Sequence, residues 1–410
     1  MKTNATMGFA GLAVIMVLAF TAVQALSSCA SFEMAAPALA PALSPALATT
    51  SAPALSPTLA PAPADEKSTM QEDGQVTYFR EIFYLDTYID ITLYVDMDAG
   101  NDIDGEAALD EAEAVFMRIH GLTDRFDEES EIYRINNAPP GEGPVRVSAE
   151  TYNIIKTALE YCEQSGGAFD IGLGAVSDLW AFKNENGAIV DQVGSLPDPE
   201  QLAKAVAAGG YTKIILHEND FSVETPPGLM IDLGGIAKGY AVREAVAALI
   251  GAGIESAVID AGGNVHVIGG RRIPAADSDH RQDQASVRPW GVGVRHPRPQ
   301  KSGDLLVIVS VIDKSVVTSG DYIRYFILDG TRYHHILDPS TGAPASASIS
   351  ATIIAEDSAL ADYLSTAAFV LGPEKGLELV ASYPGVEAII VAPDMSIATS
   401  PGFDGEILIQ

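Results

Sequence analysis

An acidic and a hydroxyl residue lie four positions apart in a segment with helical periodicity. Asp362 and Thr366 fall within a helix predicted for residues 357–371, and i,i+4 spacing puts them on one face. Carboxylate and hydroxyl oxygens suit a hard cation such as Mg²⁺, which keeps waters and is usually completed by ligand phosphates. The same spacing also describes a solvated helix surface, so the pair alone leaves both interpretations open.

A second segment, residues 232–240, places paired glycines between a predicted strand and a predicted helix. Gly234 and Gly235 expose backbone amides at the helix N-terminus, where phosphate is favoured. Lys238 in the first helical turn opposes the helix dipole, and a nearby anion would resolve that conflict. The segment is neither a Walker loop nor a complete GxGxxG fingerprint, so a plain tight turn is the alternative.

Two adjacent histidines occur in the third segment, residues 333–342. Neighbouring side chains on a strand face opposite sides, so at most one of His334 and His335 points into a common site. Imidazole titrates near neutrality and is a suitable general base. A satisfied structural histidine is the competing interpretation.

The fourth segment, residues 166–172, sets an aromatic and an acidic residue among glycines. Glycine lets a ligand approach the backbone closely, and here Phe169 and Asp170 follow Gly166 and Gly167. Glycines that simply end a helix beside a core Phe explain the pattern equally well.

Hydrophobic periodicity predicts the elements that must position these segments. Strands broken by only a few helices do not suit a doubly wound parallel sheet, so the sequence predicts an α+β fold with mixed or antiparallel sheets and packed helices. The predicted elements are a strand at 89–95, helices at 109–119 and 148–165, a hairpin at 213–224, a strand from Leu229, a helix at 236–250, one strand from Val258 to Val267, a solvent loop at 271–289, a hairpin at 322–337 turning at Asp329-Gly330, and a strand at 349–355 before the helix at 357–371.

The charge balance excludes some classes of partner. Asp and Glu number 55 against 24 Lys and Arg, giving a formal net charge of -31. Such a chain does not bind nucleic acid non-specifically, and it does not dock electrostatically on anionic lipid. An anionic ligand therefore requires a local device, such as a metal ion or backbone amides.

The N-terminal region predicts export and attachment to a membrane. Lys2, an apolar run at residues 9–25 and the sequence Leu-Ser-Ser before Cys29 resemble the lipobox of bacterial lipoproteins, in which the cysteine thiol is acylated. An uncleaved membrane anchor is the alternative, and both place the body outside the cytoplasm. We expect a signal peptide at 1–28, an Ala/Pro-rich linker at 29–74 and a catalytic domain at 75–410.

The four segments, taken in this order, resemble the FAD:protein FMN transferase family (ApbE-type lipoproteins). The resemblance covers residues 80–400, with support from segments 260–264 and 318–322. It implies an ApbE-like (T-fold-type) flavin transferase domain. The sequence Leu85-Asp86-Thr87 departs from the Met-Gly-Thr that the family often has there.

The resemblance also implies an activity and a set of site residues. The FMN moiety of FAD would pass to a threonine hydroxyl of an acceptor flavoprotein in phosphoester linkage, with release of AMP. His335 would be the general base, and Mg²⁺ would be held by the Gly235 carbonyl, Asp362 and Thr366. The residues implied to contact FAD are Leu85, Phe126, Ala168, Phe169, Asp170, Asp232, Lys238 and Ile336.

Three other functions fit parts of the same sequence. An FAD pyrophosphatase would use the same metal site with water in place of the threonine hydroxyl. A surface lipoprotein could bind FAD without turnover, and a purely structural lipoprotein would bind none. The sequence does not identify the acceptor protein.

Overall fold

The centre of the molecule is a nine-stranded sheet in which every described strand pair is antiparallel. The computed structural model describes residues 67–72, 75–96, 103–180, 182, 195–273, 286–300 and 303–408. In spatial order the strands are β1 (Lys67–Glu72), β2 (Gln75–Tyr84), β3 (Thr87–Asp96), β7 (Ala257–Ala261), β8 (Asn264–Ile268), β13 (Lys314–Gly320), β16 (Ser350–Ala355), β17 (Glu387–Val391) and β18 (Ile397–Thr399).

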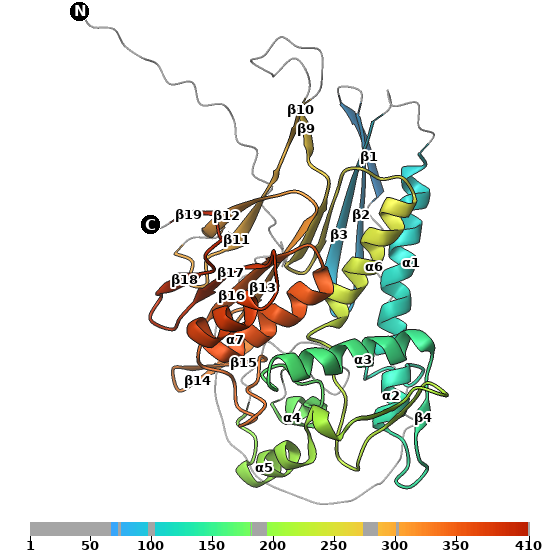
Figure 1. The fold of residues 1–410 in the computed structure, drawn as a ribbon, viewed down its shortest axis with the longest axis vertical. Helices are drawn as coiled ribbons and strands as arrows, with labels where there is room; N and C mark the ends of the chain where they lie inside the picture. Colours follow the sequence, from blue (N-terminus) through green and yellow to red (C-terminus); the bar gives the residue numbers. More distant parts are fainter. Residues whose placement is uncertain are drawn as a thin grey trace, which may run out of the picture. The chain divides into compact units, whose positions relative to one another are not determined.

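Helices cover one face of this sheet (Figure 1). The large apolar cluster on that side takes alternate residues of the strands, for example Ile353 of β16, while Ile354 belongs to the cluster on the other face. Because the middle strands are covered on both sides, all six residues of β16 are buried. The covering helices are α1 (Gly105–Thr123), α6 (Ala237–Gly251) and α7 (Ser358–Ala381).

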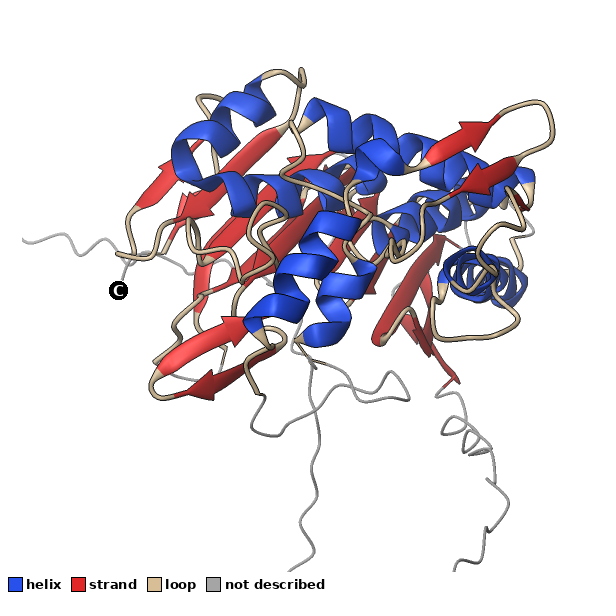
Figure 2. Ribbon diagram, turned by 90° about the horizontal axis from the view of Figure 1, so that it is seen from below, coloured by secondary structure: helices blue, strands red, loops and turns tan. Residues whose placement is uncertain are grey.

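Small sheets and short helices complete the described chain (Figure 2). The sheet of β11, β12 and β19 supplies Trp290 and Val309 to the second apolar cluster. The bounds are β11 (Trp290–Arg295), β12 (Leu305–Val311), β19 (Glu406–Ile407), β14 (Tyr325–Leu328), β15 (Thr331–His334), β4 (Val145–Arg146), β5 (Ile215–His217), β6 (Ser222–Glu224), β9 (Arg271–Ile273), β10 (Ser286–Arg288), α2 (Glu131–Asn136), α3 (Ala149–Gln164), α4 (Gly174–Leu179), α5 (Pro199–Ala208) and the 3₁₀ turn η2 (Tyr211–Lys213).

The predicted helices and both predicted hairpins are present. Ser148 caps α3 by accepting from the Thr151 amide, and Asp357 caps α7 by accepting from Leu360. The helix predicted to end near Leu371 continues to Ala381 after a break at Gly372, whose φ of 81° is left-handed. The starts of α3 and α7 therefore follow local capping signals, while Gly372 marks a break in α7 and not its end.

Four predicted elements differ from the structure. The predicted strand from Leu229 is an extended segment outside any sheet. The single strand predicted from Val258 to Val267 is the hairpin β7–β8, because Gly262 and Gly263 turn the chain with φ of 62° and 94°. The ends of the predicted solvent loop at 271–289 pair as β9 and β10. The sheet begins at Lys67, ahead of Gln75, because β1 pairs with β2 although its polar sequence lacks alternation.

The predicted signal peptide, Cys29 and most of the linker lie outside the described residues. Within the described part, no helix combines the length and the apolar character needed to cross a membrane.

Candidate active site

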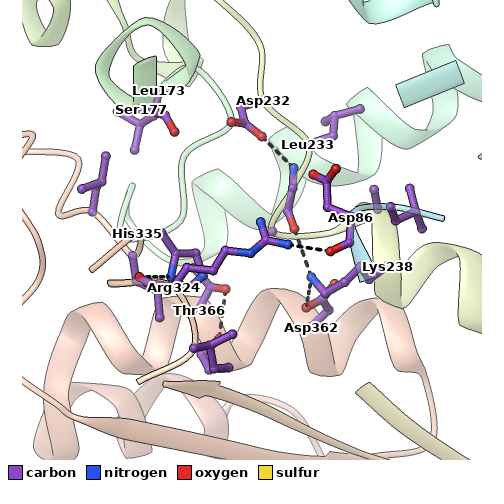
Figure 3. Close-up of a pocket in the computed structure, with 18 of the residues that line it drawn as sticks. Asp86, Leu173, Ser177, Asp232, Leu233, Lys238, Arg324, His335, Asp362 and Thr366 are labelled. Carbon is purple, nitrogen blue, oxygen red and sulfur yellow. Dashed lines mark hydrogen bonds and ion pairs between the residues drawn. The ribbon is translucent and has the colours of Figure 1, made fainter. Parts of the chain in front are cut away.

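A cavity of about 890 Å³ lies where the helical layer meets the loops after β2, α1, α3 and β13. Its lining includes every residue that the sequence proposes for a site, although these come from segments far apart in the chain (Figure 3). The structure therefore brings all of them together, and their individual roles remain predictions. The residues are Leu85, Phe126, Ala168, Phe169, Asp170, Asp232, Gly235, Lys238, His335, Ile336, Asp362 and Thr366.

Asp362 lies at a close contact between α6 and α7. Its carboxylate is almost fully buried, and its Oδ2 accepts a hydrogen bond from the amide of Gly239 at 2.9 Å. A Cβ on Gly239 would lie 2.4 Å from the Ser358 carbonyl oxygen, so only glycine allows this approach. The other oxygen, Oδ1, faces the Lys238 ammonium at 3.7 Å, and Lys238 also donates to the Gly234 carbonyl at 3.2 Å. The lysine that opposes the helix dipole thus has an acidic neighbour.

Thr366 lies one turn further along α7, beside the end of β13. Its hydroxyl is 3.4 Å from the hydroxyl of Ser319, which also contacts Ser365 at 2.8 Å. Thr318, Ser319 and Thr366 all line the cavity, so this wall is rich in hydroxyl oxygens.

These oxygens fit a magnesium ion better than a metal with nitrogen or sulfur ligands. Among the described residues, no three His, Cys, Asp or Glu side chains form a cluster able to hold a metal. One carboxylate, one hydroxyl and a loop carbonyl form an incomplete set that Mg²⁺ would complete with water and ligand phosphates. Gly235 is suited to that loop, because a Cβ there would lie 2.8 Å from the Phe169 ring.

His335 follows β15 directly and lines the cavity, while His334 faces away. The amide of His335 donates to the Arg324 carbonyl at 3.1 Å, and its Nδ1 lies 3.3 Å from the same oxygen. A carbonyl only accepts, so Nδ1 carries the proton and Nε2 keeps its lone pair. His334 is buried and its Nε2 donates to the Ala345 carbonyl at 2.9 Å. The alternation expected of neighbouring histidines is confirmed.

The electrostatic surroundings keep His335 neutral. Desolvation, followed by the positive charge of Arg324, lowers the pKa of His335 to about 3, with smaller contributions from His334 and Lys238. The direction is consistent with the three basic neighbours, although the side chain is partly exposed to the cavity. The unprotonated imidazole is the form that can accept a proton.

Phe169 and Asp170 shape the wall beside Gly235. Phe169 is buried edge-on against Tyr363, with ring centroids 5.4 Å apart. The two oxygens of Asp170 accept from the amides of Gly172 at 2.7 Å and Tyr211 at 3.1 Å. Burial raises the pKa of Asp170, and these two amides counteract part of that rise. The carboxylate therefore holds the loop, as well as lining the cavity.

Arg125 anchors the opposite wall and was not predicted from the sequence. Its Nε lies 3.2 Å from Asp232 and its Nη2 lies 2.5 Å from Asp178, while the guanidinium stacks 4.4 Å above the Phe126 ring. Burial would lower the pKa of Arg125, but Asp232 and Asp178 outweigh it and raise the pKa. This one side chain therefore positions Phe126 and Asp232, both implied to contact FAD.

Leu85 and Asp86 form the turn between β2 and β3 at the edge of the cavity. Both have left-handed φ angles, 54° and 59°, and the turn is held by a hydrogen bond from Arg324 Nη2 to the Asp86 carbonyl at 3.1 Å. A two-residue hairpin with positive φ at both positions normally favours glycine or asparagine and aspartate. Asp86 therefore adopts the backbone shape that a glycine would provide.

Comparison with known proteins identifies the family. A sequence model described as the ApbE family matches residues 85–390. The chain belongs to the ApbE family. A protein named FAD:protein FMN transferase from Treponema pallidum is 39% identical over 274 residues, 65% of this chain and 72% of that protein. One of the same name from Klebsiella pneumoniae is 32% identical over 297 residues, 70% of this chain and 85% of the relative.

Solved structures of family members share the fold. The ApbE protein from Thermotoga maritima superposes with a TM-score of 0.67 at 34% identity, covering 79% of this chain and 97% of that one. A mutant of the flavin transferase ApbE from Vibrio cholerae gives a TM-score of 0.64 at 26% identity, covering 80% and 98%. The predicted α+β, ApbE-like fold is confirmed.

Proposed function

We propose that this chain is a Mg²⁺-dependent FAD:protein FMN transferase. Its substrates are FAD and an acceptor protein that presents a threonine hydroxyl, and its products are the FMN-modified acceptor and AMP. The observation that supports the proposal best is the convergence of Lys238, His335, Asp362 and Thr366 on one cavity in a member of the ApbE family. Relatives that are up to 39% identical over the aligned residues are named for this activity.

Different residues of the chain have different roles in the proposed transfer. His335 Nε2 takes the proton of the threonine hydroxyl, because Nδ1 is already committed to the Arg324 carbonyl. The threonine oxygen then bonds to the flavin-side phosphorus as the P–O bond to AMP breaks. Asp362, Thr366 and the Gly235 carbonyl would hold Mg²⁺, which neutralises phosphate charge when bound. Lys238 adds a positive charge beside the same phosphates.

Binding of the dinucleotide relies on the cavity walls. Leu85, Phe126, Ala168, Phe169 and Ile336 supply apolar surface and backbone around the rings. Asp232 is fixed by Arg125 and by the Gly234 amide at 2.8 Å, so its carboxylate is ready to accept hydrogen bonds from a ligand. Lys238 and the proposed Mg²⁺ would offset the repulsion between the negative net charge of the chain and an anionic substrate.

A direct assay tests the proposal. The chain, FAD, Mg²⁺ and a flavin-acceptor domain are incubated, and the acceptor is run on a denaturing gel. We expect a fluorescent acceptor with the added mass of FMN and one AMP released per modification. Unmodified acceptors in several such trials would contradict the transferase. FMN and AMP formed without acceptor, faster than any transfer, would instead support the pyrophosphatase.

We further propose that the protein works outside the cytoplasm, anchored to a bacterial membrane through lipidated Cys29. Support comes from the apolar run at 9–25 and the small residues before Cys29. Cys29→Ala should abolish labelling by a fatty-acid analogue, because the acylated thiol is lost. Equal labelling of the variant would contradict an anchor at this cysteine.

A further inference from the structure

Arg324 is the second arginine of the cavity wall, and its guanidinium is held differently from that of Arg125. Arg125 is paired with two carboxylates. Arg324 makes one hydrogen bond, from Nη2 to the Asp86 carbonyl at 3.1 Å, and no ion pair with a carboxylate occurs for it among the described residues. Its other N–H donors therefore stay available beside the cavity.

The same residue is in contact with the proposed base. The Arg324 backbone carbonyl accepts from the His335 amide and faces its Nδ1, and the Arg324 side chain extends from there across the cavity to Asp86 (Figure 3). Lys238 lies beside Asp362, one of the proposed metal ligands. The two cations also depress the pKa of His335, so both are within electrostatic reach of its ring.

We propose that the Arg324 guanidinium binds the flavin-side phosphate of the dinucleotide, the phosphate that the threonine oxygen attacks and that stays with FMN. The proposal rests on the proposed function, which places that phosphorus next to His335. A general base must lie beside the hydroxyl that it deprotonates, so the attacked phosphate is close to His335 and hence to Arg324. A planar guanidinium offers two parallel donors to phosphate oxygens and stabilises charge that develops there during transfer.

Binding measurements with flavins that differ in this phosphate test the proposal. Riboflavin, FMN and FAD are titrated into the wild-type chain and into Arg324→Gln, followed by flavin fluorescence. We expect FMN and FAD to bind about tenfold to a hundredfold more weakly to the variant, the range for a charge-assisted hydrogen bond. Riboflavin, which lacks this phosphate, should bind to the variant within twofold of its wild-type affinity.

Two further variants separate charge from shape. Glutamine is about two bonds shorter than arginine, so Arg324→Gln loses both the charge and the contact that Nη2 makes with the Asp86 carbonyl. Lysine is longer and keeps a positive charge. Arg324→Lys should recover part of the FMN affinity. Arg118→Gln, a matched change at an exposed pair with Glu150, should alter no affinity.

Each other outcome overturns the proposal. Unchanged FMN affinity in Arg324→Gln excludes phosphate binding, and an equal loss for riboflavin would assign the residue to cavity shape. An Arg324→Lys variant as weak as the glutamine variant would exclude a charge-based role. If the wild type binds FMN through Arg324 yet modifies no acceptor, the proposed transferase fails, and only the contact between Arg324 and the flavin phosphate is kept.

Discussion

The Gly239 amide donates to Asp362 Oδ2 across the contact between α6 and α7. A backbone group of one helix thus fixes the carboxylate that lies on the next, and the remaining oxygen is left toward the cavity. The position of the proposed metal ligand is therefore set by helix packing and does not depend on a flexible side-chain network.

Gly239→Ala should separate the two helices. The new Cβ would lie 2.4 Å from the Ser358 carbonyl oxygen and 2.6 Å from the Asp362 Cβ, both in rigid surroundings. We expect a loss of about 1–3 kcal/mol in the free energy of unfolding by urea, together with a large loss of transfer activity. Gly251→Ala is the control at the other end of α6, where nothing lies within 4 Å of an added Cβ, and it should be nearly neutral.

Asp362→Asn should remove the dependence on Mg²⁺ while the fold persists. The amide oxygen can still accept from Gly239, so the helix contact survives, but the anionic ligand is lost. Transfer at saturating FAD should fall by about two or more orders of magnitude, and a magnesium titration should lose its saturable response. Near-normal, magnesium-dependent turnover in this variant would remove Asp362 from the metal site. Asp357→Asn, at the cap of the same helix, should keep the wild-type response.

The pH dependence of kcat/KM should report a base that stays neutral over an unusually wide range. Burial and Arg324 lower the pKa of His335 from 6.5 to about 3, so protonation inactivates the free enzyme only well below the ordinary histidine range. We expect kcat/KM to remain level from pH 8 to pH 6. His335→Gln should lose transfer but keep FAD binding. An acid limb centred at 6.5 or above in the wild-type profile would contradict the lowered pKa of His335.

Ionisation of Asp90 should destabilise the folded protein at alkaline pH, compared with mild acid. Burial, with help from Asp260 and Glu81, raises the pKa of Asp90 from 3.8 to about 6. The folded state then binds the Asp90 proton more tightly than the unfolded chain does. The stabilisation that comes from protonated Asp90 is therefore lost as the pH rises from about 4 through about 6. Asp90→Asn should stabilise the protein by about 1 kcal/mol at pH 8, after allowance for partial exposure, and by almost nothing below pH 4. Urea unfolding at the two pH values measures the difference, and equal effects would exclude the ionisation.

Local sequence patterns predicted the relative directions of site residues that are close together in the sequence. Asp362 and Thr366 share a helix face, and the opposite directions of His334 and His335 follow from strand geometry, so short-range reasoning placed these side chains. Their proposed roles came from the resemblance to the family. Arg125 and Arg324 were missed because their importance comes from partners distant in sequence, Asp178 and Asp232 for one and Asp86 for the other. Nothing in their immediate neighbours signals such contacts.

The same limit explains the errors in the fold. The β7–β8 hairpin could have been found, because Asp260 precedes Gly262-Gly263 and its Oδ1 accepts from the Gly263 amide at 2.8 Å, a common turn arrangement. The absence of a strand at Leu229 could not have been predicted. The backbone of this segment makes single hydrogen bonds outside any sheet: the Met230 carbonyl accepts from the Gly174 amide, and the Asp232 amide donates to the Ile171 carbonyl. An apolar run predicts burial, while only the tertiary fold decides whether a strand partner lies alongside.

The cavity is lined by residues from Leu85 to Thr366, contributed by segments that lie far apart in the sequence. The complete binding surface therefore exists only where the folded chain brings these distant segments together. A single cut within this span that lets the pieces separate should abolish binding of the dinucleotide.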